Sequence, residues 1–412
     1  MNHFFSLILA TFLLLTFSCA NETPTPRSTP DPVVYNCTDN PDACDLVAAN
    51  NTFGFKLFQT LHQEDPDKNI FLSPLSISTA LSMTLNGADG NTKMEMEQTL
   101  EQIDLGLETV NQAFQYVLTA LPQLDPEVQF DLANSIWQDE NFSAYPAFLE
   151  TNQTYYNSEL QVLDFKDPVS VVTINDWVKA NTGGKIEQVI ENIPSNAVMY
   201  LINAIYFKGN WRFPFDPENT TTQDFTLADN STIPVDMMRY EQEIQLPFFA
   251  NNQIMMLDLP YGDSTFSMSL ILPHPNSNLD EVIANLNEEN WTNWTEGLYP
   301  SGMMVQLPKF KMKYDKKLNE TLMAMGMVEA FDDVRANFTK LGPGALYISM
   351  VKHKAVLEVN EEGTEAAAVT VVEISDEAAA PAMIFNRPFL LAIRENKTNS
   401  VLFLGKVMEP EM

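Results

Sequence analysis

Apolar residues recur with helical spacing in the first third of the chain. In "FGFKLFQTL", Phe53, Leu57, Phe58 and Leu61 are one, three or four residues apart and fall on one face of a helix. The segment 78–100, "STALSMTLNGADGNTKMEMEQTL", predicts a helix, a turn at its glycines and a second helix. We therefore expect helices to dominate this part of the molecule.

The later part of the chain is rich in runs typical of strands. Apolar, β-branched and aromatic residues concentrate in short segments bounded by turn residues. These segments are 198–207, 255–261, 266–274, 303–314, 353–360, 389–395 and 400–408. Helices come first and strands later, without strict alternation, so the pattern predicts an α+β fold rather than a doubly wound one.

The N-terminus resembles an export signal. Residues 4–18, "FFSLILATFLLLTFS", form an apolar run of signal-peptide length that is short for a membrane span. Two ways of processing residues 1–20 stay open. A signal peptidase would cut before Asn21, whereas "TFSC" resembles a lipobox in which Cys19 would carry a lipid anchor. Either way, the sequence predicts a secreted or surface-anchored protein.

Residues 21–48 are rich in Pro, Thr, Asn and Asp, which predicts an extended tether before a domain at 49–410. This segment contains Cys37 and Cys44, an even pair in an oxidising compartment, which favours a local disulfide. Zinc binding is the alternative, but two thiols without a nearby histidine make only half a site. We expect no metal and no cofactor.

The charge balance limits the range of partners. The chain has 55 acidic and 23 basic residues, a net charge of −32, and we expect no cluster of Lys and Arg that could form a phosphate-binding patch. We therefore expect neither nucleic-acid binding nor activation by heparin-like polymers. Sequons such as Asn141, Asn219, Asn290 and Asn337 would be glycosylated only in a eukaryotic source.

Catalytic motifs are missing from the sequence. The four histidines do not form H-E-x-x-H, and no serine occupies G-x-S-x-G. His353 lies in a strongly patterned strand, where a hydrogen-bonded core histidine is the simpler interpretation. A secreted hydrolase is therefore disfavoured.

One segment, 363–381, "GTEAAAVTVVEISDEAAAP", combines helix formers with a β-branched run. As a strand, its even positions from Thr364 to Val372 are small or apolar, whereas its odd positions carry Glu365 and Glu373. One face could be buried. The acidic, alanine-rich end at 376–381 instead suggests an exposed loop.

Six motifs spread over the chain together resemble the serpin family. They are "NIFLSPLSIS" (69–78), "LINAIYFKGNW" (201–211), "LPKFKM" (307–312), "HKAVLEVNEEGTEAAA" (353–368), "FNRPFLLAI" (385–393) and "LFLGKV" (402–407). The resemblance implies the serpin fold, with about nine helices around three β-sheets and an exposed reactive-centre loop.

The resemblance also implies roles for particular residues. Two groups should surround the central sheet. The shutter beneath it would consist of Ser73, Ser76, Asn203 and His353. The breach at its top would consist of Trp211 and the pair Lys309 and Glu361.

The hinge of the reactive loop would follow the breach. Its residues would be Glu361, Glu362, Gly363, Thr364, Glu365, Ala366, Ala367 and Ala368. In the family, the cleaved bond follows the fourteenth residue after the hinge glycine, and 363 + 14 = 377 gives Glu377-Ala378. Slippage by one or two residues to Asp376, Ala378 or Ala379 stays open.

The resemblance implies that the chain is an inhibitor and not an enzyme. A serine protease, or alternatively a cysteine protease, would cleave the loop of the monomer and be trapped covalently when the loop becomes a strand. The alternative is a non-inhibitory serpin that acts as a carrier or chaperone, against which the small hinge residues argue.

Overall fold

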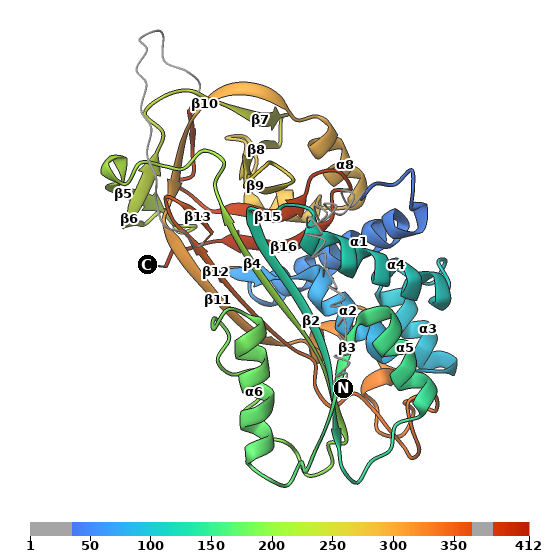
Figure 1. The fold of residues 1–412 in the computed structure, drawn as a ribbon. Helices are drawn as coiled ribbons and strands as arrows, with labels where there is room; N and C mark the ends of the chain where they lie inside the picture. Colours follow the sequence, from blue (N-terminus) through green and yellow to red (C-terminus); the bar gives the residue numbers. More distant parts are fainter. Residues whose placement is uncertain (1–34, 365–381, 412) are drawn as a thin grey trace, which may run out of the picture. The chain divides into compact units, whose positions relative to one another are not determined.

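The computed structural model describes residues 35–364 and 382–411, and these residues form an α+β fold (Figure 1). Nine α-helices lie in the described residues. They are α1 (Pro41–Glu64), α2 (Pro74–Leu85), α3 (Gly90–Thr99), α4 (Leu107–Ala120), α5 (Pro146–Tyr156), α6 (Val169–Asn181), α7 (Leu279–Ala284), α8 (Glu288–Glu296) and α9 (Asn319–Ala324). The predicted class and number of helices are confirmed.

The described strands form three hydrogen-bonded groups, as predicted. The largest has ten strands, β1 (Ile70–Leu72), β5 (Thr221–Thr226), β6 (Thr232–Arg239), β7 (Ile244–Ala250), β8 (Ile254–Pro260), β9 (Phe266–Pro273), β10 (Tyr299–Pro308), β14 (Ala382–Ile384), β15 (Phe389–Glu395) and β16 (Val401–Val407). The second has the order β13 (Gly363–Thr364), β4 (Met199–Asn210), β2 (Val128–Asp139) and β3 (Ser158–Leu163). The third is the antiparallel pair β11 (Phe310–Lys317) and β12 (Lys352–Val359).

Helices cover both faces of β2 and β4. Helices α2 and α5 lie with α1 and α4 on one side, and α6 lies on the other (Figure 1). Beneath α6, Trp137 of β2 and Ile202 of β4 pack with Ile174 in a separate apolar cluster. Both faces of these strands are therefore covered, at least in part, by helices.

Two predicted boundaries differ from the structure. The segment 303–314, predicted as one strand, divides at Lys309 into β10 and β11, and the Lys309 amide donates to the carbonyl of Asp236 in β6. The predicted tether 21–48 is folded at its end, because α1 begins at Pro41 and Tyr35 is buried. Tyr35 stacks on Tyr116 at 5.7 Å between ring centroids. The structure joins Cys37 and Cys44 in a disulfide at the start of α1.

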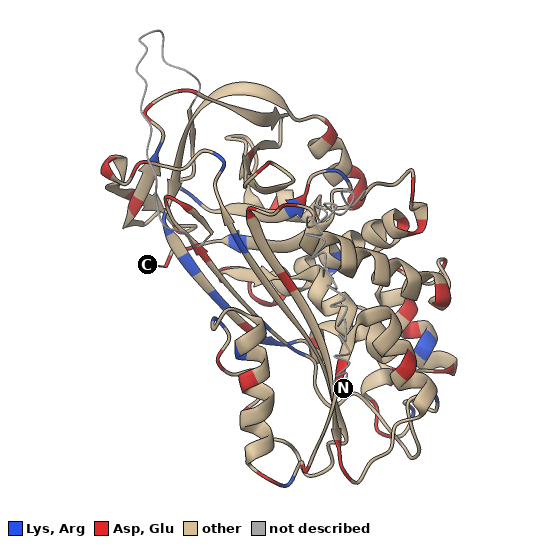
Figure 2. Ribbon diagram, viewed as in Figure 1, with Lys and Arg blue, Asp and Glu red and all other residues tan. Residues whose placement is uncertain are grey.

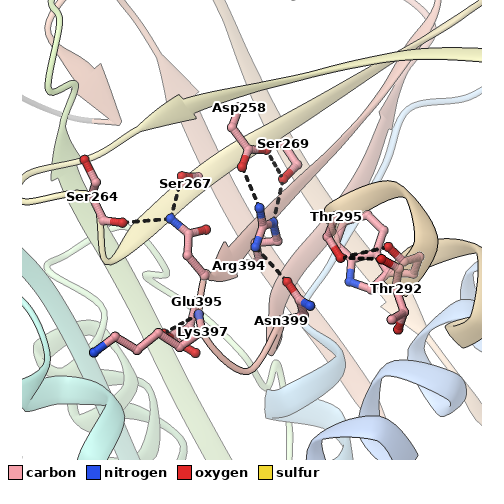
Figure 3. Close-up of polar contacts among 12 residues, drawn as sticks. Asp258, Ser264, Ser267, Ser269, Thr292, Thr295, Arg394, Glu395, Lys397 and Asn399 are labelled. Carbon is pink, nitrogen blue, oxygen red and sulfur yellow. Dashed lines mark hydrogen bonds and ion pairs between the residues drawn. The ribbon is translucent and has the colours of Figure 1, made fainter. Parts of the chain in front are cut away.

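A buried ion pair crosses three strands of the largest sheet (Figure 3). Arg394 of β15 pairs with Asp258 of β8 and donates from Nε to Ser269 Oγ of β9 at 2.9 Å. Its Nη1 donates to Asn399 Oδ1 at 2.8 Å. Both charged side chains are almost fully buried, so loss of either one would leave an uncompensated charge inside the protein.

Candidate functional site

The predicted hinge turns back at the end of β12. The backbones of Asn360 and Gly363 bridge each other, and Asn360 Oδ1 accepts from the amides of Glu362 and Gly363 at 3.0 and 3.2 Å. The chain then pairs antiparallel with the end of β4, Gly363 opposite Asn210 and Thr364 opposite Gly209. The hinge is therefore a short hairpin whose second arm has joined β4.

Glycine is required at position 363. Its φ is 150°, and a Cβ there would lie 2.2 Å from the carbonyl oxygen of Gly209. Close contact of the two backbones thus excludes any side chain. The next side chain, Thr364, is buried, and its Oγ1 and the Tyr261 hydroxyl share a hydrogen bond of 2.7 Å.

The predicted breach tryptophan lies against this hairpin. Trp211 stacks on Tyr261 at 4.6 Å between centroids, and its Nε1 donates to the carbonyl of Asn360 at 2.9 Å. The amide of Trp211 donates to the carbonyl of Glu362 at 2.8 Å. No role was predicted for Tyr261 from the sequence, although it is the last residue of the strand-like run 255–261.

The structure also brings Lys309 and Glu361 together. Lys309 Nζ lies 2.9 Å from Glu361 Oε2, and Thr220 Oγ1 donates to Glu361 Oε1 at 2.8 Å. Burial opposes ionisation of Glu361, but the hydrogen bonds from Lys309 and Thr220 outweigh it, so the pKa of the carboxyl lies below its ordinary value. Glu361, at the base of the hinge, is therefore held in its ionised form.

Three of the four predicted shutter residues are connected. The amide of Ser73 donates to His353 Nε2 at 3.2 Å, and Ser73 Oγ accepts from the amide of Ser76 as the N-cap of α2. Burial lowers the pKa of His353 to about 4, so its ring is neutral near pH 7. Nε2 can accept a hydrogen bond only when the ring is neutral.

The fourth shutter residue, Asn203, bonds elsewhere. Its Nδ2 donates to Asn134 Oδ1 at 2.8 Å, and Asn134 Nδ2 donates to the carbonyl of Tyr156. Asn203 Oδ1 is buried and has no hydrogen-bond partner among the described residues. No role was predicted for Asn134 from the sequence, because a single polar residue in a half-buried strand does not indicate a function.

Strands β4 and β12 are not paired with each other in the described residues. We call the space between residues 199–208 of β4 and residues 352–359 of β12 the strand gap. Within the described part of the chain, β4 pairs on its other edge with β2, β12 pairs only with β11, and no strand occupies the gap below Thr364. A cavity of about 200 Å³ is lined by Ser76, Asn203 and His353, and a smaller one by Ile205, Leu357 and Thr364.

Lysines are concentrated on β11 and β12 (Figure 2), so the expectation that the chain has no cluster of Lys and Arg is wrong here. They are Lys311, Lys313, Lys317, Lys352 and Lys354. Alternate residues share one face of a strand, and the register sets Lys317 opposite Lys352. Asp315 and Glu358 neutralise part of this charge.

Some predicted residues lie outside the described part of the chain. They are the lipobox residue Cys19, the hinge residues Glu365, Ala366, Ala367 and Ala368, and the reactive bond Glu377-Ala378. In the described ranges, no group of three or more potential ligands is placed to hold a metal ion. Nor does any helix there have the length and apolar character to cross a bilayer.

Known proteins match the chain over most of its length. The family model Serpin (serine protease inhibitor) matches residues 48–410. Serpin A3-6 of Bos taurus is 35% identical over 378 residues, which cover 90% of this chain and 89% of that protein.

Two solved structures are similar in fold and in sequence. Native tengpin, a thermophilic serpin, is 34% identical with a TM-score of 0.80, over 88% of this chain and 94% of that one. Human thyroxine-binding globulin is 31% identical with a TM-score of 0.82, over 90% of this chain and all of that one. The chain therefore belongs to the serpin family of protease inhibitors.

Proposed function

We propose that this serpin inhibits an extracellular serine protease by acting as a suicide substrate. The observation that carries the proposal is the pairing of Gly363 and Thr364 with β4 at one end of the strand gap. The first two residues of an additional strand are in place, and unpaired edges of β4 and β12 continue beyond them. After cleavage, the following residues would continue this strand into the gap.

The two registers at the hinge can be extended along the loop. In an antiparallel pair, the numbers of two opposite residues have a constant sum. This sum is 573 against β4, from Thr364 opposite Gly209, and 723 against the chain of β12, from Gly363 opposite Asn360. An inserted Thr370 would then come opposite Asn203 and also opposite His353, since 573 − 370 = 203 and 723 − 370 = 353. Both registers therefore bring one hydroxyl between two shutter residues.

The same extension separates the two faces of the inserted strand. Thr364 faces the interior beside Tyr261, so even-numbered residues would follow it inward and odd-numbered ones outward. The inward set is small or apolar as far as Val372, whereas Glu365 would face outward opposite Lys208. This agreement supports insertion in that register.

Insertion would release enough free energy to deform a protease. About a dozen residues would each form a backbone hydrogen bond worth about 0.5–1.5 kcal/mol, on the order of 10 kcal/mol together. At about 3.3 Å per residue, the cleaved end would travel about 40 Å.

The protease would supply the chemistry. Its serine oxygen would attack the carbonyl carbon of Glu377, the bond to the nitrogen of Ala378 would break, and the new amine would take the proton from the protease histidine. The ester would then join the protease to residue 377. Movement of that residue would displace the catalytic serine from its oxyanion hole before water hydrolyses the ester.

The proposed reactive residue predicts the class of target. A glutamate side chain is costly to bury unpaired, so the specificity pocket of the protease should carry a positive charge. The apolar run at 4–18 supports an extracellular location, where such a protease would be met.

A carrier function is the second candidate, because thyroxine-binding globulin is among the similar structures. The buried, small Thr364 and the alanines at 366–368 favour an inhibitor, since a loop that never inserts has no need of a small buried face.

The experiment is incubation with serine proteases of acid-specific, trypsin-like and elastase-like preference. We expect a complex resistant to denaturant with the acid-specific enzyme only, and a released peptide that begins at Ala378 by mass spectrometry. A peptide beginning at another residue would refute the assignment of the bond. Loop cleavage by every enzyme without any stable complex would refute inhibition itself.

A further inference from the structure

A buried lysine closes the end of α1. Lys406 of β16 is buried, and its Nζ donates to the carbonyl oxygens of Asp65, at 2.9 Å, and Pro66, at 2.6 Å, directly after the helix. Its third contact is Nδ1 of His62, at 2.8 Å. An ammonium group has three N–H donors and no acceptor, so each donor of Lys406 has one partner here. Neither Lys406 nor His62 belongs to the hinge, breach or shutter groups.

These contacts fix the tautomer of His62. Because the ammonium of Lys406 can only donate, Nδ1 of the ring has to accept, and the ring proton is on Nε2. Nε2 lies 3.2 Å from Oδ1 of Asp280, in the first turn of α7, and donates to this exposed carboxylate. The neutral ring thus links α7 to β16. An additional proton could bind only at Nδ1, where the positive charge of Lys406 is 2.8 Å away.

The end of α1 is also held by a second sheet, and it leads to the shutter. Lys316 Nζ of β11 lies 2.9 Å from Glu64 Oε2 and 2.8 Å from Asp65 Oδ2. Residues 67–69 then lead into β1, which ends directly before the shutter residue Ser73. Lysines from two sheets therefore hold a turn that only a few residues and a short strand separate from the shutter.

We propose that His62 is a proton-sensitive switch that releases the end of α1 from β16 on acidification. At neutral pH the ring accepts a hydrogen bond from Lys406. A proton on Nδ1 removes this acceptor and places two positive charges in contact, so Lys406 withdraws and the segment that leads to Ser73 loosens. The switch rests on the proposed function only for its consequence in inhibition, and not for the proton uptake itself.

The charges around His62 agree with this direction. The facing groups are Lys406 from β16, Asp280 from α7, and Asp65 and Asp67 from the segment after α1. Burial, and next the charge of Lys406, lower the pKa of His62 below its ordinary value of 6.5, although Asp280 opposes them. Burial also lowers the pKa of Lys406, to about 8, so this side chain is still mostly protonated at pH 7.

A histidine whose pKa is lowered in the folded state stabilises that state while the ring is neutral. The unfolded chain takes up the proton near pH 6.5, whereas the folded protein takes it up only at lower pH. The contribution of His62 to stability is therefore complete above pH 6.5 and is lost as the pH falls below it. The contact is closed at neutral pH and opens in acid.

Nuclear magnetic resonance of the ring nitrogens tests the switch without a protease. The chain has only four histidines, so each ring can be assigned by substitution. At pH 7.5 we expect His62 to carry its proton on Nε2, and its pKa to lie below 6.5. Asp280→Asn, at an exposed position, removes the carboxylate that favours protonation and should lower this pKa further. A proton on Nδ1 at pH 7.5, or a pKa of 6.5 or above, would overturn the switch.

Urea unfolding measures the effect on stability. His62→Asn keeps an acceptor for Lys406 but has no ring to titrate. Between pH 7.5 and 5.0, the folding constant of the parent should fall further than that of His62→Asn, by at most about thirtyfold, because pH 5.0 lies about 1.5 units below 6.5. Titration of His353 and of the carboxylates is common to both proteins and cancels in this comparison.

The matched control is His274→Asn, at a half-buried position in the loop after β9, which should lose as much stability in acid as the parent. Equal losses in the parent and in His62→Asn would overturn the switch.

A last measurement gives the consequence for inhibition. After incubation at pH 5.0 and return to pH 7.5, the parent should trap less of the acid-specific protease than His62→Asn, because its shutter has been loosened. Equal trapping by the two proteins would contradict release toward the shutter. Failure to trap before any acid treatment would count against the proposed function and leave the ring titration unaffected.

Discussion

The two ends of the strand gap differ in what occupies them. At the hinge end, Gly363 and Thr364 complete the sheet, and Tyr261 and Trp211 close over them. At the shutter end, β4 and β12 flank a cavity of about 200 Å³, and Asn203 Oδ1 has no partner among the described residues. The hinge end already contains the start of an additional strand, whereas the shutter end contains polar groups that no such strand contacts. Insertion would therefore begin where contacts exist and proceed toward groups that gain a partner.

The largest effect is expected where the hinge end is blocked. Thr364→Arg removes the bond to Tyr261 and places a guanidinium on the buried face, at a cost of several kcal/mol. Because each 1.4 kcal/mol slows insertion about tenfold, the acyl bond should hydrolyse first. The variant should become a substrate, with more than about ten molecules cleaved per protease trapped, as counted by titration.

A matched control separates charge from position. Thr221→Arg adds the same side chain at an exposed position of β5, at the edge of the ten-stranded sheet, and should inhibit like the parent. If Thr364→Arg also inhibits like the parent, the hinge does not insert in the proposed register.

A smaller effect is expected at the shutter end. His353→Ala leaves the buried amide of Ser73 without its acceptor, which should destabilise the native state by about 1–3 kcal/mol. Weaker packing beneath the gap should also favour unwanted insertion, seen as a lower melting temperature and as oligomers in size-exclusion chromatography after warming. His274→Ala, at a half-buried position outside the gap, is the control. Equal melting temperatures of parent and His353→Ala would contradict the assignment.

The sequence predicted individual strands better than their partners. Apolar, β-branched and aromatic runs at 353–360 and 389–395 gave strands with limits correct to within a residue, because such a run is a local property of the chain. A run does not specify its neighbouring strand, so the register that sets Lys317 opposite Lys352, and the pairing of Arg394 with Asp258, could not be found. These contacts join residues far apart in the chain.

The candidate site was predictable to a similar extent. Trp211, Lys309 and Glu361 followed from motifs and do meet in the structure. Asn134 and Tyr261 belong to no motif, and each acts through a neighbour that the fold supplies. A polar residue in a strand or turn has too many ordinary uses for its role to be inferred before its partners are known.

The smallest expected effect tests the register at the shutter directly. An inserted Thr370 would place its hydroxyl between Asn203 Oδ1, which has no partner in the described residues, and His353. Thr370→Val keeps the shape and removes the hydroxyl, so the inserted form should lose about 1 kcal/mol while the native form is unchanged. Urea unfolding of the loop-cleaved protein measures this loss, and unfolding of the uncleaved protein is the control. In a double-mutant cycle with Asn203→Ala, the two changes should not add, because they remove the two ends of one hydrogen bond. Additive losses would show that the inserted strand has another register, and the residue expected at the cleaved bond would then change as well.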